Sequence, residues 1–194
     1  FQCDNGFPNP KDAIEPLLSI TVKNHQSKKF VGWGVGKFQK DRDDVTYVEC
    51  SDKLHLIKEF LSFWESHQPD IITGWNTEFF DIPYLCNRIE KLCGEDEVKR
   101  LSPWRSVFSR EVFKMGRKHQ VFDIQGVSHL DYFDLYRKFT YTAQESYRLD
   151  HIAFVELGDR KDGNPYETVS EWYQKDFQSF NEYNIMDVEI VDRL

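Results

Sequence analysis

The chain has 194 residues, 40% of them hydrophobic, and a formal net charge of −8 at pH 7. This length suits one domain with a substantial core, no apolar run is long enough to span a bilayer, and the negative charge argues against bulk coating of duplex DNA. Four cysteines without a C-x-x-C pair indicate a reduced, cytoplasmic setting, and six scattered histidines give zinc little support.

Three strands and a helix are expected in the first third of the chain. Leu17–Val22 and Phe30–Val35 flank a polar turn, Val45–Val48 is a third β-rich run, and together they predict a β-meander. Ser51 and Asp52 are suitable caps for the helix that follows. Its apolar positions, which repeat with the helical period to about His67, are Ile57, Phe60, Leu61 and Trp64.

The middle of the chain alternates short strands with helices. Ile71 and Ile72 form a short β-run, and a loop leads from there into a helix that begins near Asp81. Residues 107 to 124 alternate apolar and polar side chains about a tip at Met115-Gly116-Arg117-Lys118, which predicts a β-hairpin. Val127–Tyr132 is another predicted strand.

The last third is mostly helical by pattern. Helices are expected over Asp134–Phe139 and Leu149–Val155, a loop over residues 158–165, and a final helix from about Ser179. Strands that alternate with helices predict an α/β fold, with a mixed sheet flanked by helices and a hairpin insertion near 108–124. We expect one domain over residues 1–194. Because the chain begins without Met and ends inside an apolar-periodic run, we expect it to be a piece of a longer protein.

Asp81 is the first acid whose role the sequence leaves open. It follows two phenylalanines, Phe79 and Phe80, and stands two residues before Pro83, at the start of an apolar helical series. One interpretation is helix capping, which suits an acid at this position. The other interpretation is a metal ligand.

Asp187 raises a similar question on the last helix. Together with Tyr183 it belongs to a helical face that is otherwise apolar, formed by Ile190, Val191 and Leu194. A buried carboxylate needs a hydrogen-bond donor, a basic residue or a metal ion. The four-residue spacing places the Tyr183 phenol one helical turn from the Asp187 carboxylate.

Basic residues are concentrated between Lys99 and Lys118, where seven of them accompany one acid, Glu111. A solvated surface hairpin is the simple interpretation, and a local contact with phosphate is the alternative. Two acids that follow, Asp131 and Asp134, could be taken for metal ligands. We expect instead that Asp134 caps the helix ending at Phe139 and that Asp131 makes a structural bond.

Several motifs in order resemble family B DNA polymerases, particularly the T-even phage branch. Those that resemble its second and third exonuclease motifs are Thr73-Gly74-Trp75-Asn76 with Phe80-Asp81, and Tyr183-Asn184-Ile185-Met186-Asp187. The similarity extends over most of the chain, including residues 81–88, 99–103 and 126–139 and the front stretch Gly6-Phe7-Pro8-Asn9-Pro10.

The resemblance implies a ribonuclease-H-like fold and a 3′→5′ proofreading exonuclease that removes the terminal nucleotide as a monophosphate. It implies two Mg²⁺ or Mn²⁺ ions, with Asp81 and Asp187 as metal ligands and Tyr183 orienting the attacking water. Asn76 and Phe80 would contact the terminal nucleotide. The family's hairpin implies DNA contacts for the cations at the corresponding positions, Arg110, Lys114, Arg117 and Lys118.

One family motif has no counterpart at the expected place. The first motif, an Asp-x-Glu on the opening strand, normally lies shortly before the Gly6-Phe7-Pro8 segment, and Asp4 does not match it because Gly6 stands two residues later. We therefore expect the parent protein to be an active DNA polymerase with exonuclease activity and the 194 residues alone to be inactive.

The expected partners are a single-stranded 3′ primer end, polymerase domains of the same chain and, through the parent, a sliding clamp and a single-strand-binding protein; no membrane partner is expected. Two alternatives stay open. One is a free-standing exonuclease of the same superfamily, although Tyr183 disfavours the branch that uses His five residues before the last Asp. The other is an inactivated nuclease fold kept as a DNA-binding or scaffold module.

Overall fold

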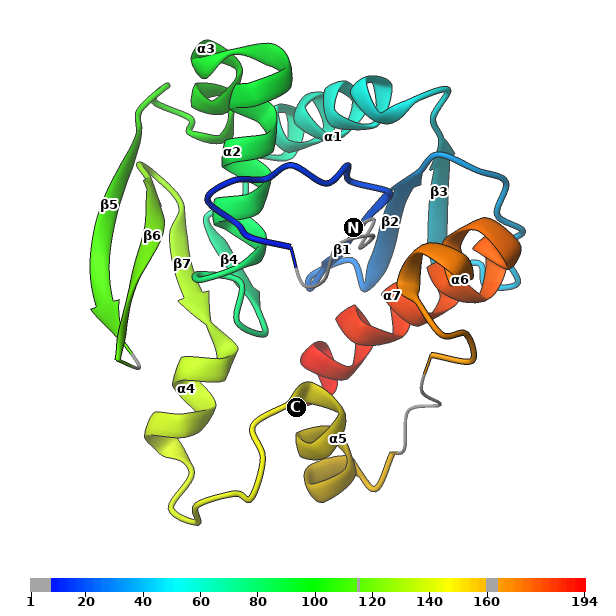
Figure 1. Ribbon diagram of the computed structural model, residues 1–194, viewed down its shortest axis with the longest axis vertical. Coiled ribbons are helices and arrows are strands. Elements are labelled where there is room, and N and C mark those ends of the chain that lie inside the picture. The colour runs from blue at the N-terminus through cyan, green and yellow to red at the C-terminus, as the bar shows by residue number, and fades with distance from the viewer. Residues whose placement is uncertain (1–7, 115, 160–163) are drawn as a thin grey trace. The chain divides into compact units, whose positions relative to one another are not determined.

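The structure is a computed structural model that describes residues 8–114, 116–159 and 164–194 (Figure 1). It contains two compact units: one holds the described residues 15–56 and 143–194, and the other holds residues 8–14 and 57–142. The expectations for Asp4, Gly6-Phe7, Met115 and the centre of the 158–165 loop lie outside the described residues. No helix in the described ranges has both the length and the apolar character needed to cross a bilayer.

The first unit is built on a three-stranded mixed sheet in the order β1-β2-β3. Its strands are β1 (Ser19–Asn24), β2 (Lys29–Gly34) and β3 (Val45–Glu49). β1 and β2 form the expected antiparallel pair, whereas β2 and β3 are parallel, with Phe30 opposite Val45.

The predicted meander is therefore wrong at its third strand. The long connection over residues 35–44 allows the chain to return to the starting end of the sheet before β3 begins, which a tight turn would prevent. The Tyr47 hydroxyl of β3 donates a hydrogen bond of 2.8 Å to the Gly36 carbonyl and holds this connection against the sheet. Phe30 and Val45, side by side in the parallel register, are both buried in one apolar cluster.

Three helices complete the first unit. They are α5 (Leu149–Leu157), α6 (Val169–Lys175) and α7 (Phe177–Arg193), and α7 packs against β1 while α5 and α6 pack against α7. Ser19 of β1 donates a hydrogen bond of 2.6 Å to buried Asn181 and accepts one of 3.1 Å from Asn184. Ile185 joins the apolar cluster of the sheet. These contacts fix the rotation of α7 about its axis.

The second unit contains most of α1 (Lys53–His67) and the remaining elements. These are β4 (Ile71–Gly74), α2 (Asp81–Cys93), α3 (Glu95–Val98), the 3-10 helix η1 (Lys99–Leu101), β5 (Val107–Lys114), β6 (Arg117–Ile124), β7 (Ser128–Asp131) and α4 (Tyr132–Phe139). β4 and β7 are parallel, so that Gly74 and Asp131 stand opposite each other where both strands end. The loop after β4 and the start of α4 therefore lie next to each other.

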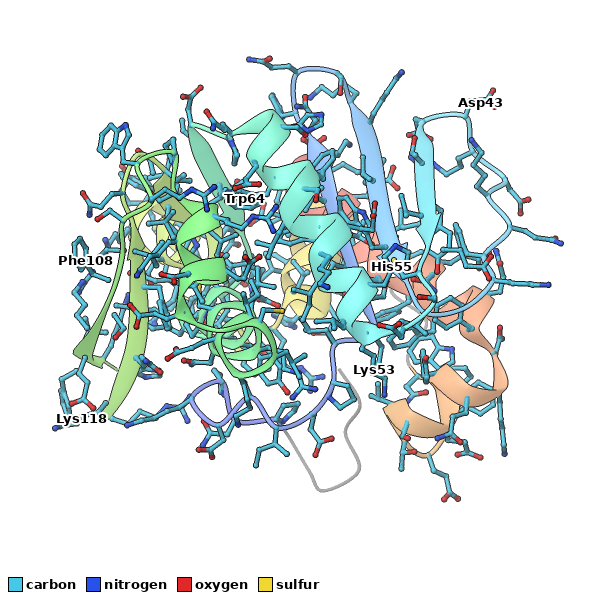
Figure 2. The ribbon with its side chains drawn as sticks, turned by 90° about the horizontal axis from the view of Figure 1, so that it is seen from above. Asp43, Lys53, His55, Trp64, Phe108 and Lys118 are labelled. Carbon is cyan, nitrogen blue, oxygen red and sulfur yellow. The ribbon has the colours of Figure 1, made fainter. Side chains whose placement is uncertain are left out.

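The predicted hairpin is confirmed as β5 and β6, which pair antiparallel from Val107 opposite Ile124 to Lys114 opposite Arg117. Its inner side packs on α2, where Asn87 donates a hydrogen bond of 3.0 Å to Gln120. Its outer side is exposed, and Figure 2 shows Phe108 and Lys118 pointing away from the unit.

The α/β class with helices flanking small sheets is confirmed, consistent with a ribonuclease-H-like exonuclease domain. The predicted helix ending at His67 is α1, and Asp52 caps it by accepting the amides of Leu54 and His55. Cys86 and Cys93, both on α2, are free thiols. That residues 1–194 form one domain stays a prediction.

Candidate functional site

Asp81 occupies the first position of α2. The N-cap residue is Phe80, and its side chain makes no cap hydrogen bond. The capping interpretation of Asp81 is therefore wrong. The Asp81 carboxylate accepts a hydrogen bond from its own main-chain amide.

The loop between β4 and α2 carries the other residues expected to contact the terminal nucleotide. Asn76 adopts a left-handed backbone conformation with φ of 62°, and its amide donates a hydrogen bond of 3.0 Å to Asp131. The Phe80 ring lies 6.0 Å, centre to centre, from the ring of Tyr84 on α2. Asn76, Phe80 and Asp81 thus belong to one loop and helix start.

The electrostatic environment of Asp81 disfavours its charged form. Loss of solvation by the surrounding protein atoms raises the pKa of Asp81 to about 7, and the negative charge of Asp131 adds to the effect. The residue as a whole is nevertheless exposed to solvent. A cation bound at Asp81 would reverse this shift and stabilise the carboxylate.

Tyr183 and Asp187 lie one turn apart on α7, as the sequence predicts. Asp187 is half-buried and its Oδ1 atom is shielded from solvent. The Tyr183 ring packs edge-on against Trp172 of α6, with 5.1 Å between ring centres. Burial raises the pKa of Tyr183, and the negative charge of Asp150 acts in the same direction. The phenol therefore keeps its proton at neutral pH.

The expected DNA-binding cations of the hairpin each have a partner in the second unit. Arg110 pairs with Asp123 across the strands at 2.7 Å, and Lys118 pairs with Glu111 at 3.2 Å. The Arg117 Nε atom lies 3.3 Å from His119. Lys114 forms an ion pair with Asp134 and lies over the Phe79 ring.

These hairpin cations differ in how much remains available to a ligand. The side chain of Lys118 is 74% exposed and that of Arg110 is 50% exposed, whereas that of Lys114 is 34% exposed. Lys118 and Arg110 can exchange their exposed partners for phosphate at little energetic cost. Their role in DNA binding stays a prediction.

The expectation for the two acids near α4 is half correct. Asp131 forms structural bonds, but it is also the N-cap of α4 and accepts the Phe133 amide at 3.0 Å. Asp134 does not cap the helix and pairs with Lys114 instead. The reason is that α4 begins at Tyr132, two residues earlier than predicted, which leaves Asp134 inside the first turn.

Divalent cations such as Mg²⁺ bind carboxylate oxygens, and both Asp81 and Asp187 offer them. Within the described ranges, no three His, Cys, Asp or Glu residues come together as a complete metal-binding group. The two aspartates therefore suit a hard cation as part of a larger ligand set, not as a complete one. Asp81 belongs to the second unit and Asp187 to the first, and their convergence on shared ions stays a prediction.

Two supporting residues were missed from the sequence. Trp172 packs against Tyr183 from α6, a helix that was not predicted. The signal for this helix was the capping-box pattern Thr168-x-x-Glu171, in which the Thr168 hydroxyl accepts the Glu171 amide at 3.0 Å. Asp131 was expected to be structural, but its link to the loop before Asp81 depends on the pairing of β4 with β7, which local sequence does not reveal.

Comparisons with known proteins identify the family of the chain. The chain matches the family described as DNA polymerase family B, exonuclease domain, over residues 1–152. It is 35% identical to the DNA-directed DNA polymerase of Escherichia phage RB69 over 95% of this chain and 23% of that protein. It is 36% identical to the DNA-directed DNA polymerase of Enterobacteria phage T4 over 80% of this chain and 17% of that protein.

A more distant relative is the DNA polymerase of Orgyia pseudotsugata multicapsid polyhedrosis virus, which is 26% identical over 78% of this chain and 16% of that protein. The chain thus spans less than a quarter of the length of these relatives. The family match covers all of the second unit, including the loop before α2, and the phage RB69 match covers nearly all of the chain. The chain belongs to the family of exonuclease domains of family B DNA polymerases.

Proposed function

We propose that these residues form the 3′→5′ proofreading exonuclease site of a family B DNA polymerase. The observation that carries the proposal is the local setting of the motif residues in a chain of this family: Asp81 opens a helix without capping it, and Asp187 stands one turn beyond Tyr183. The reaction consumes one water, breaks the terminal phosphodiester at its bond to the 3′ oxygen and releases a nucleoside monophosphate.

In this proposal Asp81 and Asp187 each contribute a carboxylate to divalent cations, Mg²⁺ or Mn²⁺, together with the Asp-x-Glu pair that the family places before the Gly6-Phe7-Pro8 segment. When bound, two such ions would activate the water and stabilise the leaving oxygen. Tyr183, protonated at neutral pH, would donate a hydrogen bond that orients the water. Asn76 and Phe80 would hold the terminal nucleotide.

The proposed substrate is the single-stranded 3′ end of a primer. The exposed cations Arg110, Arg117 and Lys118 would contact its phosphates, and Lys114 would join them by leaving Asp134. The proposed partners are the polymerase domains of the same parent chain and, through that chain, a sliding clamp and a single-strand-binding protein. We propose the cytoplasm as the location, which is that of the host cell if the protein is encoded by a phage.

The test uses the full natural chain that contains these residues and a single-stranded oligonucleotide labelled at its 3′ end. With Mg²⁺ or Mn²⁺ we expect release of nucleoside monophosphates, and Asp81→Asn or Asp187→Asn should each lower the rate about a hundredfold or more. Asp43→Asn is the matched control, because Asp43 is an exposed loop acid, labelled in Figure 2, outside both motifs.

Unchanged rates in both motif variants would contradict the assignment. A wild-type chain that binds DNA without cleaving it would instead support an inactivated DNA-binding module. The 194 residues alone should not trim DNA, because two of the four metal ligands of the family are absent from the expected place. Robust metal-dependent trimming by this piece would overturn that part of the proposal.

A further inference from the structure

The loop between β4 and α2 has a strained start that needs external support. Asn76, which is not glycine, has φ of 62°, in the left-handed region. This conformation is strained for a non-glycine residue, although Asn tolerates it better than most. Within the loop, the Phe80 amide donates to the Asn76 carbonyl at 3.1 Å, which closes one turn. The amides of Asn76 and Glu78 find their acceptor elsewhere.

That acceptor is the carboxylate of Asp131, at the end of β7. Its Oδ1 atom accepts the Asn76 amide at 3.0 Å, and its Oδ2 atom accepts the Glu78 amide at 2.8 Å. Oδ1 also accepts the Phe133 amide at the start of α4. Asp131 is 5% exposed, so these charge-assisted bonds are protected from competing water.

The two residues before Asp131 hold the same loop. The Thr73 hydroxyl donates a hydrogen bond of 2.7 Å to the Leu130 carbonyl, and the Thr77 hydroxyl lies 2.8 Å from the His129 Nε2 atom. Three consecutive residues of β7 therefore contact the loop and its entry. The parallel pairing of β4 with β7 places them there, because Gly74 stands opposite Asp131.

We propose that Asp131 is a positioning residue for the exonuclease reaction, which holds the loop of Asn76 and Phe80, and thereby Asp81, in the geometry that the substrate and cations require. This inference rests on the proposed function. Both Asp131 oxygens accept main-chain amides, so the proposed role of Asp131 is exerted through the loop. The proposed role of Asp131, which lies between the second and third motifs in the sequence, is therefore distinct from metal binding.

The test separates the cap of α4 from the support of the loop. In Asp131→Ser the serine hydroxyl remains a good N-cap for α4, but its single oxygen cannot also accept the amides of Asn76 and Glu78. Asp131→Asn is the milder variant, because its amide keeps one oxygen acceptor. Asp52→Ser is the matched control, since Asp52 caps α1 by similar bonds and lies outside both exonuclease motifs.

The first readout is amide hydrogen exchange of the full natural chain without metal, which requires no activity. In Asp131→Ser we expect exchange in residues 75–80 to rise about tenfold or more and exchange in α4 to rise less than about threefold. The second readout is exonuclease kinetics, in which we expect kcat to fall about tenfold and the Mn²⁺ concentration for half-maximal rate to rise about fivefold. Asp131→Asn should give smaller changes in the same direction.

Unchanged exchange in residues 75–80 overturns the proposal whatever the kinetics show. So does a loop that exchanges faster while kcat and the Mn²⁺ requirement stay at wild-type values. If Asp131→Ser does not fold, as judged by its thermal transition, Asp131→Asn decides by the same two readouts. A wild-type chain without exonuclease activity would overturn the proposed function, and it would do so separately from the exchange result on the loop.

Discussion

Lys114, the last residue of β5, forms an ion pair with Asp134 in the first turn of α4. The Lys114 ammonium also lies 4.7 Å from the centre of the Phe79 ring, one residue before Phe80. His119 of β6 approaches the same ring, with 4.9 Å between ring centres. The end of the hairpin is thus docked on the loop that precedes Asp81, and Lys114 can leave for a phosphate only by releasing Asp134.

The Lys114–Asp134 pair leads to a prediction that separates the contribution of Lys114 to stability from its contribution to DNA binding. Since both side chains are partly exposed, a double-mutant cycle of Lys114→Gln and Asp134→Asn should give a coupling of about 0.5–1 kcal/mol in the free energy of unfolding. If Lys114 also contacts phosphate, Lys114→Gln weakens binding of single-stranded DNA, whereas Asp134→Asn strengthens it by freeing the cation. Chemical denaturation and DNA titration at two salt concentrations measure these effects.

The control for this pair is Lys118→Gln, which removes an exposed cation whose partner is Glu111. It should change stability by less than about 0.5 kcal/mol and reduce the salt dependence of DNA binding. Equal loss of DNA affinity in Lys114→Gln and Asp134→Asn would show that the docked hairpin, rather than a Lys114 contact with phosphate, supports binding.

Tyr183 should act as a protonated phenol across the working pH range. Burial and the charge of Asp150 raise its pKa, so ionisation begins at higher pH than for an ordinary tyrosine. We expect Tyr183→Phe to lower the exonuclease kcat about tenfold with little change in KM for DNA. In wild type, no loss of rate from Tyr183 ionisation should occur as pH rises from 7 to 9.

Tyr173→Phe is the matched control for Tyr183→Phe. Tyr173 lies in the same unit, burial raises its pKa too, and its hydroxyl donates a hydrogen bond of 3.1 Å to the Val35 carbonyl. It should affect stability and leave kcat within about twofold. If both variants lowered kcat equally, the Tyr183 hydroxyl would have only a packing role.

Local pattern was sufficient for most elements and for the motif residues. The apolar period located α1 and α2, alternation located the hairpin, and the spacing of Tyr183 and Asp187 located them on one helix face. Each of these features depends on residues close in sequence. Such features are set by the period of a helix or strand and are visible without knowledge of the fold.

Features that depend on distant pairing were not predictable in this way. The parallel direction of β3 is decided by how the 35–44 connection packs, and composition carries no signal of strand direction. Which residue caps α4 depends on where that helix begins. Because the predicted start was two residues too late, the sequence analysis assigned the N-cap to Asp134 instead of Asp131. The bonds from Asp131 to the loop follow from the pairing of β4 with β7.

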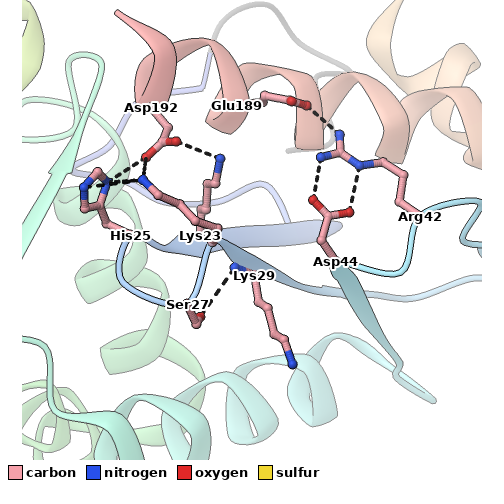
Figure 3. A network of polar contacts seen from close by, with 9 residues as sticks. Lys23, His25, Ser27, Lys29, Arg42, Asp44, Glu189 and Asp192 are labelled. Atoms are coloured by element: carbon pink, nitrogen blue, oxygen red, sulfur yellow. Dashed lines mark hydrogen bonds and ion pairs between the residues drawn. The ribbon is translucent and has the colours of Figure 1, made fainter.

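Asp192, near the end of α7, should make the stability of the first unit depend on pH. Hydrogen bonds from Lys23 at 2.7 Å and His25 at 2.9 Å lower its pKa, and the Lys28 charge adds to the effect (Figure 3). A carboxylate with a lowered folded pKa contributes stability above its unfolded pKa, near 4, and loses it as pH falls through the folded value.

We therefore expect Asp192→Asn to lower the free energy of unfolding at pH 7 by about 1 kcal/mol, since the pair with Lys23 is mostly shielded from solvent. The difference from wild type should shrink as pH falls below about 4, because protonated Asp192 no longer attracts the lysines. Denaturant unfolding at several pH values measures this, with Asp43→Asn as the exposed control. A difference that stays constant down to pH 2.5 would contradict the assignment.

Gly74 should be required because the loop after it turns back over its α-carbon. A methyl group at position 74 would lie 2.3 Å from the Cγ2 atom of Thr77. Thr77 cannot rotate away cheaply, since its hydroxyl is held at 2.8 Å by His129. We expect Gly74→Ala to lower the free energy of unfolding by about 1–3 kcal/mol and to reduce exonuclease rate by displacing the loop.

The decisive comparison is the double variant Gly74→Ala with Thr77→Ser. Serine lacks the clashing methyl group and keeps the hydroxyl that meets His129, so the double variant should recover most of the stability and rate. Gly32→Ala on β2 is the control, because its added methyl group meets Tyr47 at an ordinary 3.5 Å and should cost less than about 0.5 kcal/mol. If Thr77→Ser gave no recovery, the close approach would not be what selects glycine at position 74.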